Sequence, residues 1–148
     1  MAALVISNPV WAELPDISTV KPDLAVPDLS EKPPGAGRRV KAVLPGYEGT
    51  GVYHLLYLPS DWLPGRRYPV LVEYAGNGPY RDRNREVSSG RVEGSRMGYG
   101  ISGGERYIWL CLPYLDGEGR ANVRRWWGSK PEHDPQPTVH YCRPVSYT

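Results

Sequence analysis

The sequence predicts an α/β fold whose mainly parallel sheet is incomplete within its 148 residues. Two β-rich runs joined by a glycine-rich turn predict an antiparallel hairpin. A third run ends in a turn with two glycines, and a fourth is apolar almost throughout. Apolar strands of this kind are buried on both faces and belong to sheets that helices cover. Only one helix is indicated, so the predicted strands lack most of their cover.

The first 37 residues predict an extended or disordered lead-in. Within residues 13–37, proline stands at positions 15, 22, 27, 33 and 34, and apolar residues are too sparse for a core. The apolar start AALVISNPVWAEL ends in a small-residue pattern that signal cleavage sites tolerate, although it lacks a basic beginning. It is either part of the lead-in or the remnant of a signal segment, which would indicate a secreted or periplasmic protein. Residues 38–148 form the predicted partial domain.

This domain begins with the hairpin and the third strand. Residues 38–44 (RRVKAVL) and 52–58 (VYHLLYL) are the two β-rich runs, and the glycine-rich turn PGYEGTG joins them. A loop over 59–67 leads to residues 68–75 (YPVLVEYA), which we predict to be a buried strand. Because the turn of the hairpin is long, the sequence does not determine the pairing register.

The second half of the chain contributes the fourth strand and the single helix. Residues 76–104 are polar and rich in glycine, which predicts a loop or a short helix. Residues 106–115 (RYIWLCLPYL) predict the last strand, buried on both faces, with an unpaired edge that favours association. Residues 138–142 (TVHYC) predict a helix that Thr138 caps and Pro144 stops after little more than one turn.

Charge and cysteine content exclude several classes of function. The net charge of +2 is too small to indicate a nucleic-acid partner. No run approaches the roughly 18 apolar residues of a membrane span. Cys111 and Cys142 fit no metal-site spacing, and there is no nucleotide-binding motif, so neither a metal nor a cofactor is predicted. Cys111 lies in an apolar run, which favours a buried thiol over a disulfide.

The ordered series VYHLLYLPSDWLPGRRYPVLVEYAGNGPY and then YIWLCLPYL resembles the N-terminal part of an α/β-hydrolase. The similar branch is that of polyhydroxybutyrate-depolymerase-like and feruloyl-esterase-like proteins, and the resemblance covers residues 38–142. It implies a hairpin that opens the sheet, two central strands, and an oxyanion loop after the third strand. It also implies hydrolysis of carboxylic esters by a serine nucleophile without a cofactor, on a small-molecule or polymeric ester in the complete protein.

Gly76, Asn77 and Gly78 are the candidate oxyanion loop. An acyl-transfer oxyanion needs two preorganised N–H donors, and this fold takes one from the loop after the third strand. In the register of the family, Asn77 or Gly78 presents that N–H. The family often has a histidine before the first glycine, and here Ala75 stands there. A tight corner without a catalytic role is the alternative interpretation of this turn.

The sequence does not predict a complete catalytic triad. Ser102 lies in a literal G-x-S-x-G, but a strand follows it where a nucleophile elbow needs a helix, so we predict a loop residue. Its partners in chain order would be Asp116 or Asp134 and His133 or His140, an order that chance easily produces.

The remaining histidine, His54, is predicted to pack in its strand. The family's nucleophile, acid and histidine all lie beyond the helix at 138. We therefore expect an inactive fragment, a frameshifted product or a truncated form, with a strand and G-x-S-x-G encoded downstream of codon 148.

Two other functions remain open. The 11 Tyr and 5 Trp, together with the cluster RRWW at 124–127, would suit a β-rich module that binds carbohydrate or another polymer on exposed aromatic rings. The apolar run at 106–115 argues against it, because the strands of an antiparallel sandwich normally alternate. A small autonomous esterase that uses Ser102 is the other alternative.

Overall fold

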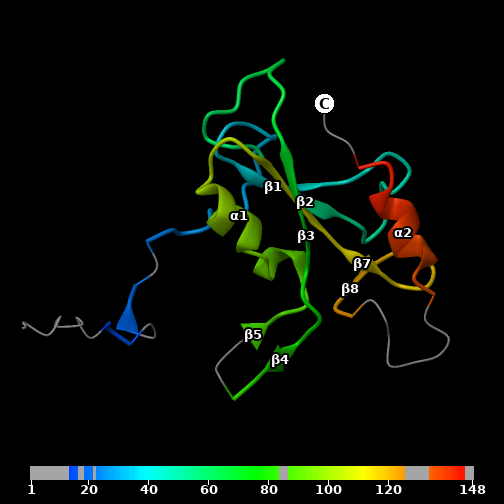
Figure 1. The fold of residues 1–148 in the computed structure, drawn as a ribbon. Coiled ribbons are helices and arrows are strands. Elements are labelled where there is room, and N and C mark those ends of the chain that lie inside the picture. Colours follow the sequence, from blue (N-terminus) through cyan, green and yellow to red (C-terminus); the bar gives the residue numbers. More distant parts are fainter. Residues whose placement is uncertain (1–13, 17–18, 22, 84–86, 126–133, 146–148) are drawn as a thin grey trace, which may run out of the picture.

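The computed structural model describes residues 14–16, 19–21, 23–83, 87–125 and 134–145. They form a four-stranded mixed sheet with one helix on each side (Figure 1). The elements in chain order are β1 (Arg39–Ala42), β2 (His54–Tyr57), β3 (Val70–Tyr74), β4 (Tyr80–Arg81), β5 (Val87–Ser88), the 3₁₀ turn η2 (Val92–Gly94), α1 (Met97–Ser102), β6 (Ile108–Leu112), β7 (Tyr114–Leu115), β8 (Asn122–Val123) and α2 (Gln136–Cys142). No helix in the described part of the chain is long and apolar enough to cross a membrane.

The strand order of the sheet is β1-β2-β6-β3. β1 and β2 pair antiparallel with Val40 opposite Leu56, which confirms the predicted hairpin. β6 pairs antiparallel with β2 and parallel with β3. Among the described strands β3 is therefore at the edge, so the prediction that the last strand carries the open edge is wrong. In the inner place all five residues of β6 are buried, whereas β3 leaves Val70, Val72 and Tyr74 exposed.

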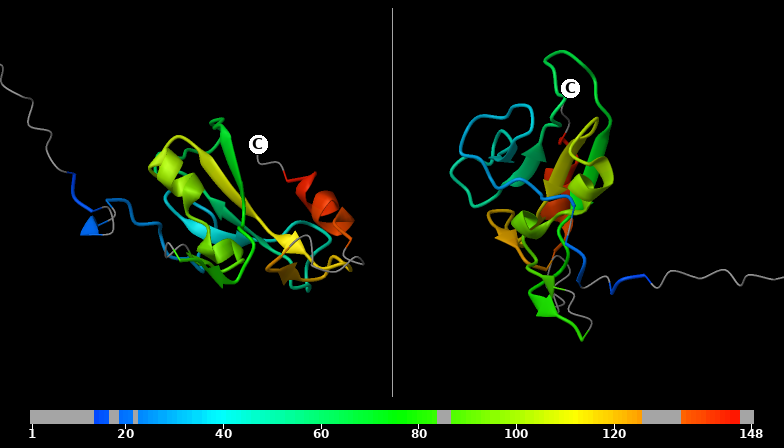
Figure 2. Two further views of the ribbon diagram at one scale, coloured as in Figure 1. Left: turned by 60° about the horizontal axis from the view of Figure 1, so that its bottom comes forward. Right: turned by 90° about the vertical axis from the view of Figure 1, so that its left-hand side faces the viewer.

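The sheet has two apolar faces, which we name after the helices beside them. The α1 face carries Leu55, Tyr57, Leu71, Trp109 and Cys111. The α2 face carries Val40, Leu56, Val72, Ile108 and Leu110. The two helices lie on opposite sides of the sheet in Figure 1 and in the left view of Figure 2.

Backbone and side chains pack closely on the α1 face. A Cβ atom at Gly98 of α1 would overlap the Trp109 ring, so only glycine allows the helix to lie this near. The Trp109 indole is 1% exposed, and the Arg39 guanidinium stacks on it at 5.0 Å from the ring centroid. This side of the sheet is therefore sealed by a short helix that touches the central strand directly.

Two buried charged residues hold the segment 92–98 on that face. One terminal nitrogen of Arg39 donates to the carbonyl oxygens of Val92, Glu93 and Ser95 at 3.3, 3.0 and 3.1 Å. The Glu73 carboxylate accepts the N–H groups of Met97 at 3.4 Å and Gly98 at 2.9 Å, at the start of α1. Buried ionic groups are stable only with such partners, and here the partners are backbone groups of the segment that covers this face.

The helix α2 closes one end of the α2 face. His54 Nδ1 and the Tyr141 hydroxyl are 2.7 Å apart, and the Leu115 N–H donates to Thr138 Oγ1 at 2.9 Å. The predicted helix is confirmed, but the predicted N-cap is wrong. Thr138 lies inside the first turn and is buried against β7, and Asp134 Oδ1 instead accepts the N–H of Gln136 at 2.9 Å.

The rest of the α2 face is open. A hollow of about 730 Å³ lies over it, lined among others by Leu56, Trp62, Tyr68 and Ile108. On β3 the same face leaves Val72 51% exposed. The strand predicted within residues 68–75 is confirmed as β3, but the prediction that it is buried is wrong, because the described chain provides no cover on this face.

Segments outside the sheet support its other edge and its ends. The predicted lead-in reaches the sheet, because Ser30 N donates to the Arg39 carbonyl at 2.8 Å and Gly37 N to that of Leu58 at 2.9 Å. Most of the start of the chain, including the signal-like residues 1–12, lies outside the described residues. The predicted loop at 76–104 contains the short strands β4 and β5, the 3₁₀ turn η2 and the helix α1. The β4–β5 pair projects from the sheet in Figures 1 and 2.

Candidate functional site

The predicted oxyanion loop lies at the carboxyl end of β3, next to the end of β6. These two strands are the only parallel pair in the described sheet. In α/β sheets ligands bind outside the carboxyl ends of parallel strands. Gly76, Asn77 and Gly78 therefore stand at the edge of the sheet where a binding site is expected.

Gly78 is a packing residue in this turn. Its N–H donates to the Arg124 carbonyl at 3.0 Å, and its carbonyl accepts from Arg125 Nε at 3.3 Å. A Cβ atom on Gly78 would overlap the backbone of Gly90, and one on Gly90 would lie 2.6 Å from the Arg124 carbonyl oxygen. Three chain segments cross here at backbone distance, which explains both glycines and removes Gly78 as an oxyanion donor.

Asn77 keeps a backbone donor. Its N–H has no acceptor among the described residues, and its buried side-chain Oδ1 also has no hydrogen-bond partner there. Of the two donors that the sequence leaves open, the geometry therefore leaves only Asn77. Gly76 permits the turn because a Cβ atom there would lie 3.1 Å from Ser88 Oγ.

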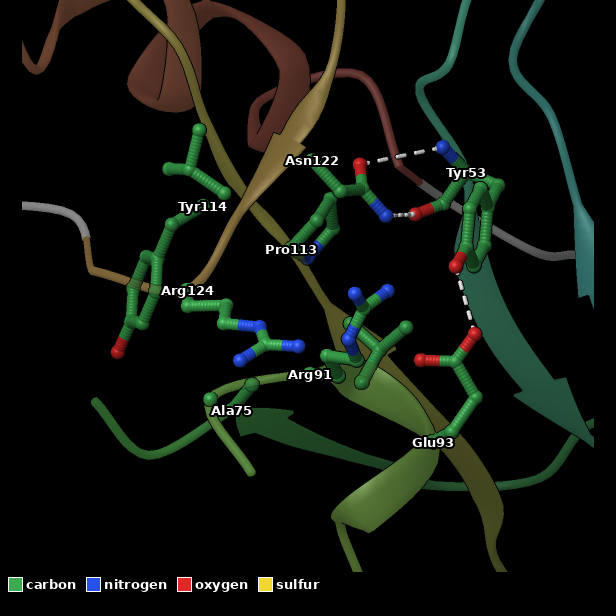
Figure 3. Close-up of a pocket in the computed structure, with 11 residues that line it drawn as sticks. Tyr53, Ala75, Arg91, Glu93, Pro113, Tyr114, Asn122 and Arg124 are labelled. Carbon is green, nitrogen blue, oxygen red and sulfur yellow. Dashed lines mark hydrogen bonds between the residues drawn. The ribbon is translucent and has the colours of Figure 1, made fainter. Parts of the chain in front are cut away.

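A cavity of about 260 Å³ opens beside this turn (Figure 3). Its lining comes from Tyr53 just before β2, from the residues that directly follow β3 and β6, and from segments 90–93 and 122–124. The lining residues are Tyr53, Ala75, Gly90, Arg91, Val92, Glu93, Pro113, Tyr114, Asn122, Val123 and Arg124. Two guanidinium groups and two tyrosine rings among them suit an anionic or planar ligand. None of these residues is a serine, threonine, cysteine or histidine, so the lining contains no candidate nucleophile or histidine base.

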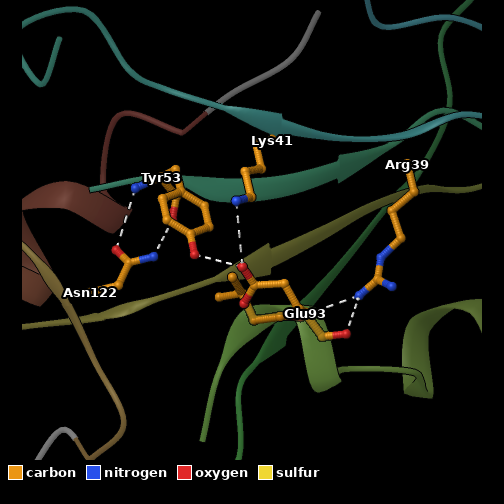
Figure 4. Close-up of polar contacts among 6 residues, drawn as sticks. Arg39, Lys41, Tyr53, Glu93 and Asn122 are labelled. Carbon is orange, nitrogen blue, oxygen red and sulfur yellow. Dashed lines mark hydrogen bonds and ion pairs between the residues drawn. The ribbon is translucent and has the colours of Figure 1, made fainter. Parts of the chain in front are cut away.

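One wall of the cavity is a hydrogen-bonded set of Tyr53, Glu93 and Asn122 (Figures 3 and 4). The Tyr53 hydroxyl donates to Glu93 Oε1 at 2.6 Å. The Asn122 amide donates to the Tyr53 carbonyl at 2.8 Å and accepts its N–H at 3.3 Å. Burial, and then the bond to Glu93, raise the pKa of Tyr53 to about 12, so this phenol stays protonated at neutral pH.

Lys41 of β1 contacts two residues of this wall. Its Nζ lies 3.8 Å from Glu93 Oε1 and 4.7 Å from the centroid of the Tyr53 ring. Nothing in the sequence pattern predicts this wall, because Tyr53 is 40 positions from Glu93 and 69 from Asn122. Tyrosine, glutamate and asparagine at such separations carry no motif, and only the sheet and the β7–β8 turn bring them together.

An aromatic pair borders the cavity. The rings of Tyr74 and Tyr114 stack at 6.2 Å between centroids with 13° between their planes, and Tyr74 is 48% exposed. Burial raises the pKa of both phenols above the ordinary value. The pair places a flat apolar surface within reach of solvent beside the cavity.

Ser102 is the last residue of α1 and acts as a local cap. Its hydroxyl donates to the Tyr99 carbonyl at 3.3 Å and accepts the Gly104 N–H at 3.1 Å. A helix precedes it and β6 follows, the reverse of a strand-to-helix elbow. The structure therefore places Ser102 at a helix end, where a loop was predicted. It brings none of the described histidine or aspartate side chains into hydrogen-bond contact with it.

The other predicted triad partners have separate structural positions. Asp116 Oδ1 accepts the Arg120 N–H at 2.8 Å inside the β7–β8 turn, and Asp134 Oδ1 accepts the N–H of Gln136, the first residue of α2. His140 is exposed on α2, and His133 lies outside the described residues. His54 is fully buried, as the packing interpretation predicts, and burial lowers its pKa to about 4.

Both cysteines are free thiols. Cys111 is buried in β6 and donates to Ser95 Oγ at 2.8 Å, and burial raises its pKa to about 12, so it is a poor nucleophile at neutral pH. The buried thiol predicted for Cys111 is confirmed. Within the described ranges, no three histidine, cysteine, aspartate or glutamate side chains gather in a way that could hold a metal ion.

These features together describe a binding cavity beside a glycine turn with one unused backbone donor. No family model, curated protein or solved structure matches the chain.

Proposed function

We propose that this chain supplies the oxyanion-loop half of a serine-dependent hydrolase of carboxylic esters and that it does not hydrolyse esters alone. The observation that carries the proposal is the position of Asn77. Its N–H lacks an acceptor among the described residues, and it lies in a glycine turn at the carboxyl end of β3, next to Ala75 and Gly90, which line the cavity. A donor so placed is what a developing oxyanion requires.

The sheet supports this proposal as well. An antiparallel hairpin comes first, a strand with a glycine-rich exit follows, and an apolar strand pairs with it in parallel. The resemblance to α/β-hydrolases implies this order. The open α2 face fits a partial domain, because parallel strands are normally covered on both faces.

The second oxyanion donor and the nucleophile would have to come from elsewhere. In the α/β-hydrolase fold the second N–H belongs to the residue after the serine. The cavity lining has no serine, and Ser102 is occupied at the end of α1. The chain is therefore proposed to bind the acyl or carboxylate portion of an ester without cleaving it.

Binding is tested with butyrate, whose carboxylate oxygens stand in for the oxyanion, by an NMR titration of the backbone amides. The Asn77 amide signal should shift saturably, and the Gly78 amide, already bonded to the Arg124 carbonyl, should shift less. Asn77→Ala keeps the N–H and should keep the response at residue 77. Asn77→Pro removes the N–H and should weaken binding. A wild-type titration without a saturable Asn77 shift contradicts the proposal.

Activity is tested separately with a p-nitrophenyl ester and a serine-reactive fluorophosphonate. Neither hydrolysis above background nor labelling is expected. If the purified chain hydrolyses the ester and Ser102→Ala abolishes it, the chain is an autonomous esterase and the proposed division of labour is wrong.

Carbohydrate or polymer binding is a second candidate, favoured by the stacked, half-exposed pair of Tyr74 and Tyr114. The described strands form one four-stranded mixed sheet flanked by helices and two separate two-stranded pairs, which does not support the sandwich form of this idea. Trp126 and Trp127, which also suggested it, lie outside the described residues. Oligosaccharides should then shift the intrinsic fluorescence of the chain and of Tyr80→Ala, but not of Tyr74→Ala. No shift across a broad panel counts against it.

A further inference from the structure

The outer edge of β3 is an unpaired edge of the described sheet. β3 pairs only with β6, whereas the opposite edge, at β1, is bridged by Leu29 of the lead-in. An open edge presents a row of backbone N–H and C=O groups that another strand can pair with. β3 therefore offers an interaction surface that β1 does not.

This edge lacks the exposed charges and prolines that normally prevent an edge strand from pairing with another strand. The exposed side chains of β3 are Val70, Val72 and Tyr74, which are 40%, 51% and 48% exposed and carry no charge. The one charged residue, Glu73, points to the α1 face and is bound by the N–H groups of Met97 and Gly98. No lysine and no proline interrupt the strand.

We propose that β3 pairs antiparallel with β3 of a second copy of this chain, about a two-fold axis through Val72. Val72 then faces Val72 of the second copy, and Val70 faces its Tyr74. Aromatic and β-branched residues are favourable cross-strand partners. The two four-stranded sheets become one continuous sheet, with the exposed apolar side chains of β3 on one surface.

The distribution of charge selects a second copy in this orientation. Two-fold pairing places each residue opposite its symmetry mate, so a charged edge would repel itself, and this edge has no exposed charge. With the axis at Val72, Arg67 faces the neutral Asn77 of the second copy, and Glu73 faces Leu71. A parallel arrangement would instead bring Arg67 beside the Arg67 of the second copy, which is unfavourable.

Sedimentation of the full chain over a range of concentrations tests the proposal. The wild type should be a dimer that dissociates on dilution. Val72→Lys should raise the dimer dissociation constant by about tenfold or more, because two lysines would face each other across the axis. Val43→Lys is the matched control, since Val43 is 49% exposed and lies beyond β1, away from this edge. It should leave the dimer unchanged.

Cross-linking tests the geometry even if Val72→Lys fails to fold. In a Cys142→Ser background, Val72→Cys should give a covalent dimer on mild oxidation, and Val43→Cys should not. A wild type that stays monomeric at its highest soluble concentration would overturn the proposal. So would a dimer that survives Val72→Lys, or open-ended polymers in place of a closed dimer. None of these outcomes depends on ester or carboxylate binding, so the proposed function stands or fails separately.

Discussion

The two faces of the sheet are closed to different degrees. On the α1 face, Gly98 allows α1 to contact Trp109. Arg39 and Glu73 form hydrogen bonds with the backbone of the segment that covers them. On the α2 face, α2 closes only the end near His54 and leaves a hollow of about 730 Å³. Equally apolar strands thus end in different environments. An apolar strand is buried only where another segment of the chain packs on its face.

The largest expected effect comes from the two tryptophans that serve the two faces. Trp109→Ala should lower the free energy of unfolding by about 3–5 kcal/mol, because a 1% exposed indole under α1 is lost. Trp62→Ala, beside the hollow, should cost about 1 kcal/mol. Urea unfolding measures both losses, provided that the dependence of the unfolding free energy on urea concentration is the same for each variant and the wild type. Equal losses would show that the α2 face is packed as tightly as the α1 face.

The second effect is a loss of stability in acid through His54, which anchors α2. Its pKa is lowered from 6.5 to about 4 in the folded chain, so the unfolded chain binds the proton more readily between these values. The contribution of about 3 kcal/mol is present above pH 6.5 and disappears as the pH falls through 6.5 toward 4.

The free energy of unfolding at pH 7 and at pH 4.5 measures this loss. His54→Gln should reduce the difference between the two pH values, and His140→Gln, at an exposed position, should preserve it. The explanation fails if His54→Gln keeps the full pH dependence.

The third effect concerns the carboxylate that holds α1. Glu73→Gln should cost about 1–2 kcal/mol, because one amide oxygen replaces two carboxylate oxygens that accept from Met97 and Gly98. Hydrogen exchange at these two amides should accelerate. Glu118→Gln, on an exposed turn, is the control and should change neither quantity.

The smallest effect separates two neighbours on β3. Leu71 packs on the α1 face and Val72 faces the open side, so Leu71→Ala should cost about 1–2 kcal/mol and Val72→Ala less than about 0.5 kcal/mol. The measurement belongs at a concentration where the chain is monomeric, since pairing would bury Val72. A larger loss for Val72→Ala would indicate cover on the α2 face.

Local pattern was enough for several parts of the fold. The alternating runs around the turn at 45–51 predicted the hairpin, and the unbroken apolar run predicted β6. Cys111, inside that run, is buried as predicted. These predictions succeed because the preference of a residue for a strand or a buried place acts over a few neighbours.

Strand order, burial and capping needed long-range information. β6 inserts between β2 and β3, so the edge is β3, although both runs are apolar. Thr138 has the chemistry of an N-cap but serves Leu115 from within the helix. Which strand receives cover and which partner a hydroxyl finds depend on segments far away in the chain.

The sequence by itself determined the secondary structure of the hairpin, of β6 and of α2, and it pointed to the glycine turn after β3. Only the tertiary structure decided that the Gly78 N–H donates to the Arg124 carbonyl and that the Asn77 N–H has no acceptor among the described residues. It alone assembled Tyr53, Glu93 and Asn122 into one wall of the cavity. The physical reason is that propensity is local, whereas a hydrogen-bond partner is found wherever the folded backbone brings one within hydrogen-bonding distance.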